Sequence, residues 1–597
     1  MSHTTTPATS ESPLRQGLIW FCVAVSVLVA MAQGAVWEHQ HDEGTTFDLG
    51  IGIIEKGEFV PVWPESPLPV TALYETVEAR SDYTVQDAVE SVTVPNYRMF
   101  HPPGYYVLIH LWTKIFGTSR IPMRLPAYFL GALAILGMVA IARRVIPEAT
   151  GTVWVALIFG LSPWVLRLEN FTRPYHLALF CAVWATVAVL NMQAEGRPRN
   201  GWRALFVVLS LIGLYSIYHY AFMLAWHLLL IAWQGWSAGR ERRRGEVIAL
   251  GAMLLGLLAG FAPWLRNFGL HLKVSGNSGD YFTGTVAETH WYTYFSRAFQ
   301  DFTIGDAIQT YQGRNLATIV LILGAVTLPV VIWAFAGPAR RALDSCARRF
   351  WISAAAVPLL ILASDMVQGG HTIFITKLCF GMIILLVLMV VRAWLALPIA
   401  WLRHTGLASW ALLFVVCMSF NTYTRAAEPS SMEDAAAVIA QADTDDHLVV
   451  LSTDLRGYSA PFLLSLRDAG VGRVFVVQAP GHKGLTELMK GVTKSTRFSR
   501  VSLVNFKIPA YKGQMMWEET FVRREVVVPA REGKEWLTFW HNRQPWMGPG
   551  APLTDNRAPT RMRELWVLGP VRAQFYSSPI VTEEDNEDAK PARRRNG

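Results

Sequence analysis

Apolar segments of about the length of a membrane-spanning helix recur in this chain from Gln16 to about Phe420. A helix needs about 20 mostly apolar residues to cross the hydrocarbon core of a bilayer. Hydrophobic residues make up 52% of the 597 residues and charged residues only 16%, which excludes an ordinary soluble protein over most of the length. Beyond residue 428 the composition becomes that of a soluble domain, so we expect one large membrane domain followed by a small globular one.

Arginine-rich loops predict the topology. With the N-terminus in the cytoplasm, every basic cluster falls on the cytoplasmic side, as the positive-inside rule requires. The formal net charge of +8 then needs no nucleic-acid partner. This agreement holds only if the apolar stretch 104–117, which is too short to span, lies at the membrane surface. The expected basic loops are 143–144, 197–203, 240–244, 340–349 and 392–403.

This topology predicts about eleven spanning helices and places two long segments, 37–121 and 267–314, on the external side. The second segment is rich in glycine and aromatic residues, and it suits either a loop that closes over a substrate or a helix lying on the membrane. The predicted spans are 16–36, 122–142, 151–168, 173–192, 203–218, 219–236, 246–266, 315–336, 350–367, 372–391 and 405–421.

The C-terminal part is predicted to be a small α/β domain. Strands are expected at 447–453 and 472–479 with a helix at 455–470 between them, which is a β-α-β pattern. Further strands are expected at 520–530 and 564–571. The expected divisions are a cytoplasmic tail at 1–15, a transmembrane domain at 16–428 with its first external loop at 37–121, an extracytoplasmic α/β domain at 429–581 and a disordered charged tail at 582–597.

Two short motifs flank the first external segment. Asp42 and Glu43 directly follow the first apolar run, and His101 precedes Pro102-Pro103 and the next apolar stretch. A carboxylate can act as a general base, and an imidazole can contact a phosphate or a departing oxygen. Two acids in a solvated loop need no such function, however, and a histidine in front of two prolines can simply mark where a short helix begins.

Five elements follow one another in a recognisable order: Asp42-Glu43, His101-Pro102-Pro103, Tyr105-Tyr106, Phe116-Gly117 and Arg124-Leu125-Pro126. In this order they resemble the membrane glycosyltransferases that use polyprenyl-phosphate sugars. That family includes the protein O-mannosyltransferases and the lipid A aminoarabinose and galacturonic acid transferases. The resemblance covers residues 16 to about 240 well and about 370 to 420 weakly.

The resemblance implies the class C glycosyltransferase fold, a mainly helical membrane protein with a large first external loop. It also implies transfer of a sugar from a polyprenyl-phosphate donor to a lipid-borne glycan, a cell-envelope polymer or a protein, with inversion at the anomeric carbon. Asp42 would be the general base, and Glu43 would support it. The site and the C-terminal domain would face outward from a bacterial-type inner or plasma membrane.

Residues for the donor phosphate are suggested by the same resemblance. Arg173 and Tyr175 belong to an Arg-Pro-Tyr motif, and His101 occupies a position where some relatives carry lysine. An arginine at the external end of a span can also reach the headgroup region without binding a substrate. Both interpretations of Arg173 are therefore open.

Two further residues are candidates. His219 lies at an external turn between two tyrosines, which an aromatic belt at the membrane surface would explain equally well. Lys377 lies about one turn into a late span, where a cation is costly and usually functional. Asp365 is an alternative partner for Lys377, and His371 is a weaker candidate of the same kind.

No cofactor is predicted. The residues His41, Asp42, Glu43 and Asp48 could together bind a divalent cation, but the resemblance does not require one. The five cysteines have no CxxC spacing, so neither a zinc site nor a disulfide framework is expected. A transporter or flippase of a lipid-linked saccharide is the alternative from another class, and a polysaccharide ligase or polymerase is the third interpretation.

Overall fold

The computed structural model describes much of the membrane part and a portion of the C-terminal part. Asp42, Glu43, His371 and Lys377 lie outside the described residues, as does the side chain of Asp365. The described residues are 12–36, 46, 54–55, 58–59, 66–77, 83–93, 101–170, 172–192, 199–237, 240–277, 311–337, 343–368, 380–427, 436–437, 439–441, 443–452, 459–479, 497–498, 500–506 and 535–541.

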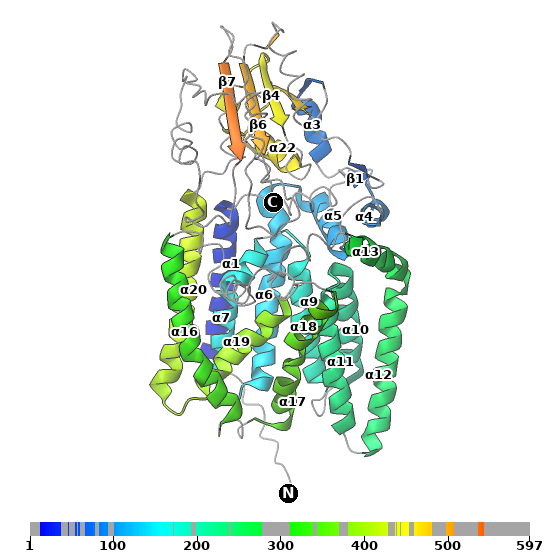
Figure 1. The fold of residues 1–597 in the computed structure, drawn as a ribbon, viewed down its shortest axis with the longest axis vertical. Coiled ribbons are helices and arrows are strands. Elements are labelled where there is room, and N and C mark those ends of the chain that lie inside the picture. Colours follow the sequence, from blue (N-terminus) through cyan, green and yellow to red (C-terminus); the bar gives the residue numbers. More distant parts are fainter. Residues whose placement is uncertain are drawn as a thin grey trace, which may run out of the picture.

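Long helices run roughly parallel and form a bundle, with a β-sheet beyond one end of it (Figure 1). The longest helices coincide with the apolar runs, because a helix satisfies every backbone hydrogen bond within the bilayer. The bundle consists of α1 (Pro13–Val36), α6 (Arg120–Val145), α7 (Gly151–Gly160), α8 (Pro163–Glu169), α9 (Tyr175–Asn191), α10 (Arg199–Ser216), α11 (Tyr220–Ser237), α12 (Arg240–Phe261), α16 (Tyr311–Ala336), α17 (Ser345–Ala354), α18 (Ala356–Gln368), α19 (Phe380–Leu395) and α20 (Ala400–Ala427).

Six described helices are long and apolar enough to cross a membrane, and a seventh span results if α7 and α8 are counted together. The prediction of a mainly helical, multi-span membrane protein is thereby confirmed. The expected number of about eleven is larger than this count, partly because α9 and α19 are apolar but shorter than 18 residues. The number eleven stays a prediction.

One predicted span, 151–168, is two helices instead of one. The axes of α7 and α8 differ by 55°. Ser162 has an extended backbone, and Pro163 opens α8. Proline has no N–H to donate and collides with the preceding turn of a helix, so the break falls at this residue.

Shorter helices gather at the end of the bundle that faces the sheet (Figure 1). They are α4 (Val85–Ser91), α5 (Gly104–Phe116) and α13 (Leu265–Asn277), and α13 follows α12 after the single turn η1 (Ala262–Trp264). With its 13 residues, α5 is about 20 Å long and cannot cross the hydrocarbon core. One face of it packs on the bundle through Tyr105 and Ile109, which are buried, and the other exposes the apolar residues Leu111 and Ile115, as expected of a helix that lies against lipid.

Five strands form a sheet in the order β3-β5-β4-β6-β7. The three pairings among β5, β4, β6 and β7 are parallel, and β4, α22 and β5 occupy the segments in which the sequence predicts strand, helix and strand. The predicted strands at 520–530 and 564–571 lie outside the described residues. The bounds are β3 (Leu68–Pro69), β4 (His447–Ser452), α22 (Ser459–Asp468), β5 (Phe475–Ala479), β6 (Arg500–Phe506) and β7 (Glu535–His541).

The first external segment contributes to this sheet. Strand β3 pairs with β5 in antiparallel orientation, and the following helix α3 (Thr71–Val77) packs on α22. Tyr74 Oη donates to the carbonyl of Val471 at 2.5 Å, and burial raises the pKa of this phenol, so it stays protonated as a donor. The first segment also holds a small hairpin, β1 (Ile54–Glu55) and β2 (Glu58–Phe59). The first external segment and the C-terminal part therefore fold against each other.

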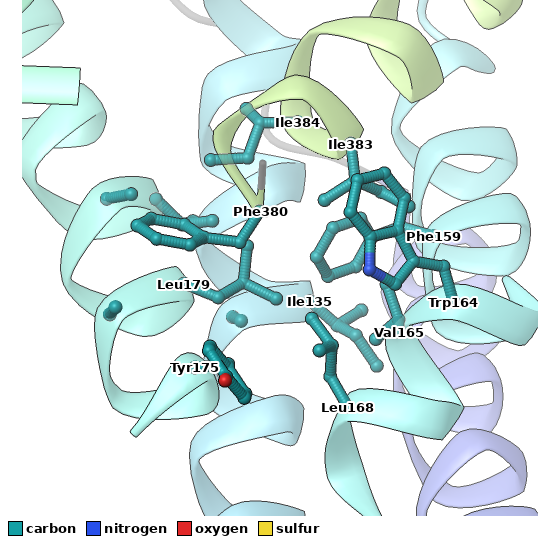
Figure 2. Packing of buried hydrophobic residues seen from close by; sticks show 14 of the residues in the cluster. Ile135, Phe159, Trp164, Val165, Leu168, Tyr175, Leu179, Phe380, Ile383 and Ile384 are labelled. Carbon is teal, nitrogen blue, oxygen red and sulfur yellow. The ribbon is translucent and has the colours of Figure 1, made fainter. Parts of the chain in front are cut away.

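The helical core is centred on α9. Figure 2 shows Phe380 of α19 beside Leu179 of α9, with Tyr175 about one turn of α9 away from Leu179 and with Trp164 and Leu168 of α8 in the same cluster. Small residues permit close packing here, because a side chain at Gly137 of α6 would collide with α9 at Val183. The rigid helix α9 begins at the end of the bundle that faces the sheet, which fixes the position of the residues just before it.

Candidate functional site

A histidine and an arginine that lie far apart in the sequence meet at the sheet-facing end of the bundle. His101 lies just before α5, and Arg173 lies just before α9. Arg173 Nη2 and His101 Nε2 are 3.2 Å apart. Arginine keeps its charge in proteins and can only donate, so the imidazole accepts through Nε2. The contact holds a cation and an imidazole side by side, which suits an anionic oxygen ligand.

Two prolines and one glycine set the position of His101. Pro102 and Pro103 restrict the backbone, and α5 begins at Gly104. Gly104 packs directly on the end of α10: a Cβ there would lie 2.7 Å from the carbonyl oxygen of Tyr215. His101 is therefore tied to α10 as well as to α9.

Replacing Gly104 with alanine should move α5 away from α10. The collision is with backbone rather than with a flexible side chain, so we expect a loss of about 1–3 kcal/mol, as for other overpacked sites. Thermal unfolding in detergent would measure it. Gly251→Ala on α12 is the matched control, because nothing lies within 4 Å of a Cβ at that position and alanine is the better helix former. Equal melting temperatures for the two variants would contradict the expected clash.

A chain of buried polar side chains crosses the bundle near Arg173. Tyr128 Oη donates to Asn170 Oδ1 at 2.9 Å, Asn170 Nδ2 lies 3.4 Å from Gln33 Oε1, and Gln33 Nε2 donates to Thr422 Oγ1 at 3.1 Å. These contacts join α6, the end of α8, α1 and α20. Buried polar groups need such partners, so the chain fixes how the four helices sit around the start of α9.

The end of α1 is fixed by the same region. Arg124 of α6 is fully buried, and its Nη1 donates to the carbonyl of Gly34 at 2.7 Å. Gly34 lies directly against Tyr128 and Asn170, and a side chain there would overlap both. The chain leaves α1 two residues later, at Val36, and continues toward Asp42 and Glu43.

One acidic residue is buried next to this chain. Glu169 ends α8 and is 2% exposed. Its carboxyl group lies against Gly131 of α6, where any side chain would overlap it. Glu169 is four residues before Arg173, so the same turn of chain carries a buried acid and a buried cation.

A second polar group lies on the other side of α5. His271 Nε2 is 3.0 Å from the carbonyl of Val92, which only accepts, so this nitrogen carries the proton. Tyr218 Oη then donates to His271 Nδ1 at 2.7 Å and accepts from Trp264 Nε1 at 2.9 Å. Burial raises the pKa of the Tyr218 phenol, which keeps the proton that this arrangement needs. The group fastens α13 and the end of α4 to the turn between α10 and α11.

The sequence-predicted residues divide into three groups. His101 and Arg173 are in contact. Tyr175 is the first residue of α9 and is 1% exposed, and His219 lies half-buried in the α10–α11 turn with its ring against Phe222. Asp42, Glu43 and Lys377 lie outside the described residues.

The residues that the sequence did not single out are Gln33, Tyr128, Asn170 and Thr422. Each is an ordinary polar residue near the end of an apolar run, and a single polar residue at such a place has no pattern of its own. The described residues contain no group of three or more His, Cys, Asp or Glu that could hold a metal ion. His41, Asp42, Glu43 and Asp48 are not among them.

Comparison with known families finds a similarity over part of the chain. Residues 100–266 match the family described as dolichyl-phosphate-mannose-protein mannosyltransferase. This segment contains His101, Arg173, Tyr175 and His219, with α5 through α12. The predicted resemblance is thereby confirmed over residues 100–266, and this segment is similar to membrane glycosyltransferases that use polyprenyl-phosphate sugars.

Solved structures give a weaker likeness. ArnT from Cupriavidus metallidurans in the apo state is 16% identical, with 80% of this chain and 91% of that chain covered at a TM-score of 0.45. The same protein bound to undecaprenyl phosphate is 15% identical, with 79% of this chain and 91% of that chain covered at a TM-score of 0.41. A third structure is the archaeal oligosaccharyltransferase AglB from Archaeoglobus fulgidus in complex with an inhibitory peptide and a dolichol-phosphate. It is 12% identical, with 78% of this chain and 65% of that chain covered at a TM-score of 0.40. A comparison with curated proteins gives no match.

Proposed function

We propose that this protein transfers a single sugar from a polyprenyl-phosphate donor to a lipid-borne glycan, a cell-envelope polymer or a protein on the external face of a bacterial-type inner or plasma membrane. The contact between His101 and Arg173 carries the proposal. It joins the two motifs of the family-matched segment at one end of the bundle, where a buried arginine and an imidazole lie side by side.

The chemistry needs one base and one leaving group. Asp42 takes the proton from the acceptor hydroxyl or amine, and the acceptor oxygen or nitrogen attacks the anomeric carbon from the side opposite the phosphate. The bond from that carbon to the phosphate oxygen breaks, and the electron pair leaves with the polyprenyl phosphate. A single displacement of this kind inverts the anomeric centre. Glu43 supports Asp42, and no cofactor or metal takes part in the proposal.

Cations and hydrogen-bond donors have to offset the charge that develops on the leaving phosphate. Arg173 and His101 are held together for this role. Lys377 precedes Phe380, the first residue of α19, by three residues in the sequence. Phe380 packs beside Leu179 of α9 (Figure 2), and Lys377 is proposed as a third group for the donor phosphate. Tyr175 and His219 are proposed to line the same site.

The orientation and the domain divisions complete the proposal. The basic ends of the helices lie on the cytoplasmic side, and about eleven spans separate the two faces. The α/β domain at 429–581 lies outside together with the first external loop 37–121. Pairing of β3 with β5 supports an arrangement in which these two parts jointly cover the site and receive the acceptor.

The test uses purified protein in liposomes with a panel of radiolabelled polyprenyl-phosphate sugars. Release of free polyprenyl phosphate together with a product one sugar heavier, measured by mass spectrometry, is the expected result. Transfer of a whole chain would indicate a ligase or polymerase instead. If no donor turns over but a lipid-linked oligosaccharide crosses the proteoliposome membrane, the transferase is excluded and the transporter or flippase takes its place.

A further inference from the structure

A cavity lies at the end of the bundle that faces away from the sheet. Its volume is about 200 Å³, and it lies between the ends of α10, α11, α12 and α17. The family-matched site is at the other end, before α9. The 17 residues of α9 span about 25 Å, so the cavity cannot be part of that site.

The cavity lining is strongly cationic. It contains Arg199, Arg203, Arg242 and Arg349, and among the described residues that line it Glu246 is the only acidic one. Glu246 accepts from Arg199 Nη1 at 3.0 Å and from Arg203 Nη2 at 2.7 Å. In the part of the chain that the structure describes, no ion pair joins Arg242 or Arg349 to a carboxylate. Like charges gathered in one cavity repel one another, so an anion would stabilise the arrangement.

A neutral donor also faces the cavity. Gln234 lines it, and the amide nitrogen Nε2 is buried without a hydrogen-bond partner among the described residues. A buried donor in this state costs free energy until an acceptor arrives. Guanidinium groups and an amide donor together match the oxygens of a phosphate group, which accept several hydrogen bonds at once.

The surroundings place the cavity at the level of the lipid headgroups. Trp236 of α11 is 70% exposed, and the guanidinium of Arg243 lies over its ring. Exposed tryptophan next to arginine is typical of a membrane–water interface. One turn further along α12, Val247 and Ile248 are 58% and 64% exposed, as expected of residues that face lipid tails.

We propose that this cavity binds the phosphate headgroup of an anionic membrane lipid, at a site separate from the one that handles the sugar donor. The positive-inside rule accounts for arginines in these loops, but it does not require them to line one cavity. Arg244 and Arg348 are exposed and are not part of the lining. Basic pockets between helix ends are a known mode of headgroup recognition.

Two double variants distinguish the effect of the cavity lining from the effect of the total positive charge in these loops. Arg242→Gln with Arg349→Gln removes two cations from the lining, and Arg244→Gln with Arg348→Gln removes two neighbouring cations outside it. Neither Arg242 nor Arg349 bridges two helices: the described side-chain bonds of Arg349 go to Ser345 of its own helix. Both double variants should therefore fold, which melting temperature and gel filtration would check.

Native mass spectrometry of the full chain, titrated with dioleoylphosphatidylglycerol and with phosphatidylcholine, is the measurement. We expect wild type and the outer pair to prefer the anionic lipid, and the cavity pair to lose at least about tenfold in affinity for it, in line with the loss of two charge-assisted contacts. Equal loss in the two double variants, or no preference in wild type, would overturn the proposal.

Inorganic phosphate identifies the group that is recognised. Phosphate that displaces the bound phosphatidylglycerol from wild type supports recognition through the headgroup phosphate. Binding of phosphate without any binding of the lipid would assign the cavity to a soluble anion and overturn the lipid assignment. Neither outcome depends on sugar transfer, so failure of the proposed transferase activity would leave this test unchanged.

Discussion

Replacing Asp42 with asparagine should lower kcat for sugar transfer by a factor of about 10²–10⁴, the usual contribution of a general base. The amide keeps the shape of the side chain but cannot take a proton from the acceptor. Binding of the polyprenyl-phosphate donor should change little, because the proposed donor contacts are made by Arg173, His101 and Lys377. Release of polyprenyl phosphate gives the rate, and a fluorescent donor analogue gives the affinity.

Asp48→Asn is the matched control, since it removes the same charge six residues further along the same external segment. It should turn over donor at nearly the wild-type rate. A variant Asp42→Asn that retains full turnover would remove Asp42 from the mechanism. Equal loss in Asp42→Asn and Asp48→Asn would point to the overall charge of the segment rather than to a base.

The helical part of the fold is largely predictable because its cause is local. A run of apolar residues in a bilayer has to be helical, and α1, α6, α16 and α20 coincide with such runs. The break between α7 and α8 falls at Pro163, and the chemistry of proline would have located it too. The short α5 follows from the small number of apolar residues between Pro103 and Gly117.

The joining of distant segments is not predictable in this way. Strand β3 is two residues long and pairs with β5, about 400 positions later in the chain. Nothing in the pair Leu68-Pro69 marks it as an edge strand, because strand propensity depends on the neighbours that a segment meets. Arg467 of α22 donates to Thr118 Oγ1 at 3.2 Å. This contact also joins two distant segments, and neither residue marks it in the sequence.

The candidate site shows the same division. His101 and Arg173 could be selected from their motifs, because unusual combinations such as His-Pro-Pro and Arg-Pro-Tyr are visible in one sequence. The contact between these two side chains could not be predicted, since it depends on how Gly104 and the core around α9 place α5 and α9. The chain from Tyr128 through Asn170 to Thr422 also exists only in the folded bundle.

Replacing Arg173 with glutamine should lower kcat/KM by a factor of about 10²–10³, the range seen when a group that stabilises a developing anion is removed. Arg173 is 5% exposed, and a charge interaction is stronger where water is excluded. The donor phosphate carries more negative charge after the glycosyl bond breaks than before, so kcat should fall more than KM rises. Arg173→Lys keeps the charge but loses the planar fork and should give an intermediate value. Arg143 lies in the last turn of α6, away from the candidate site. The variant Arg143→Gln removes the same charge as Arg173→Gln and should leave sugar transfer unchanged. A low melting temperature for Arg173→Gln, with normal kcat in the molecules that stay folded, would show that Arg173 only supports the helix ends.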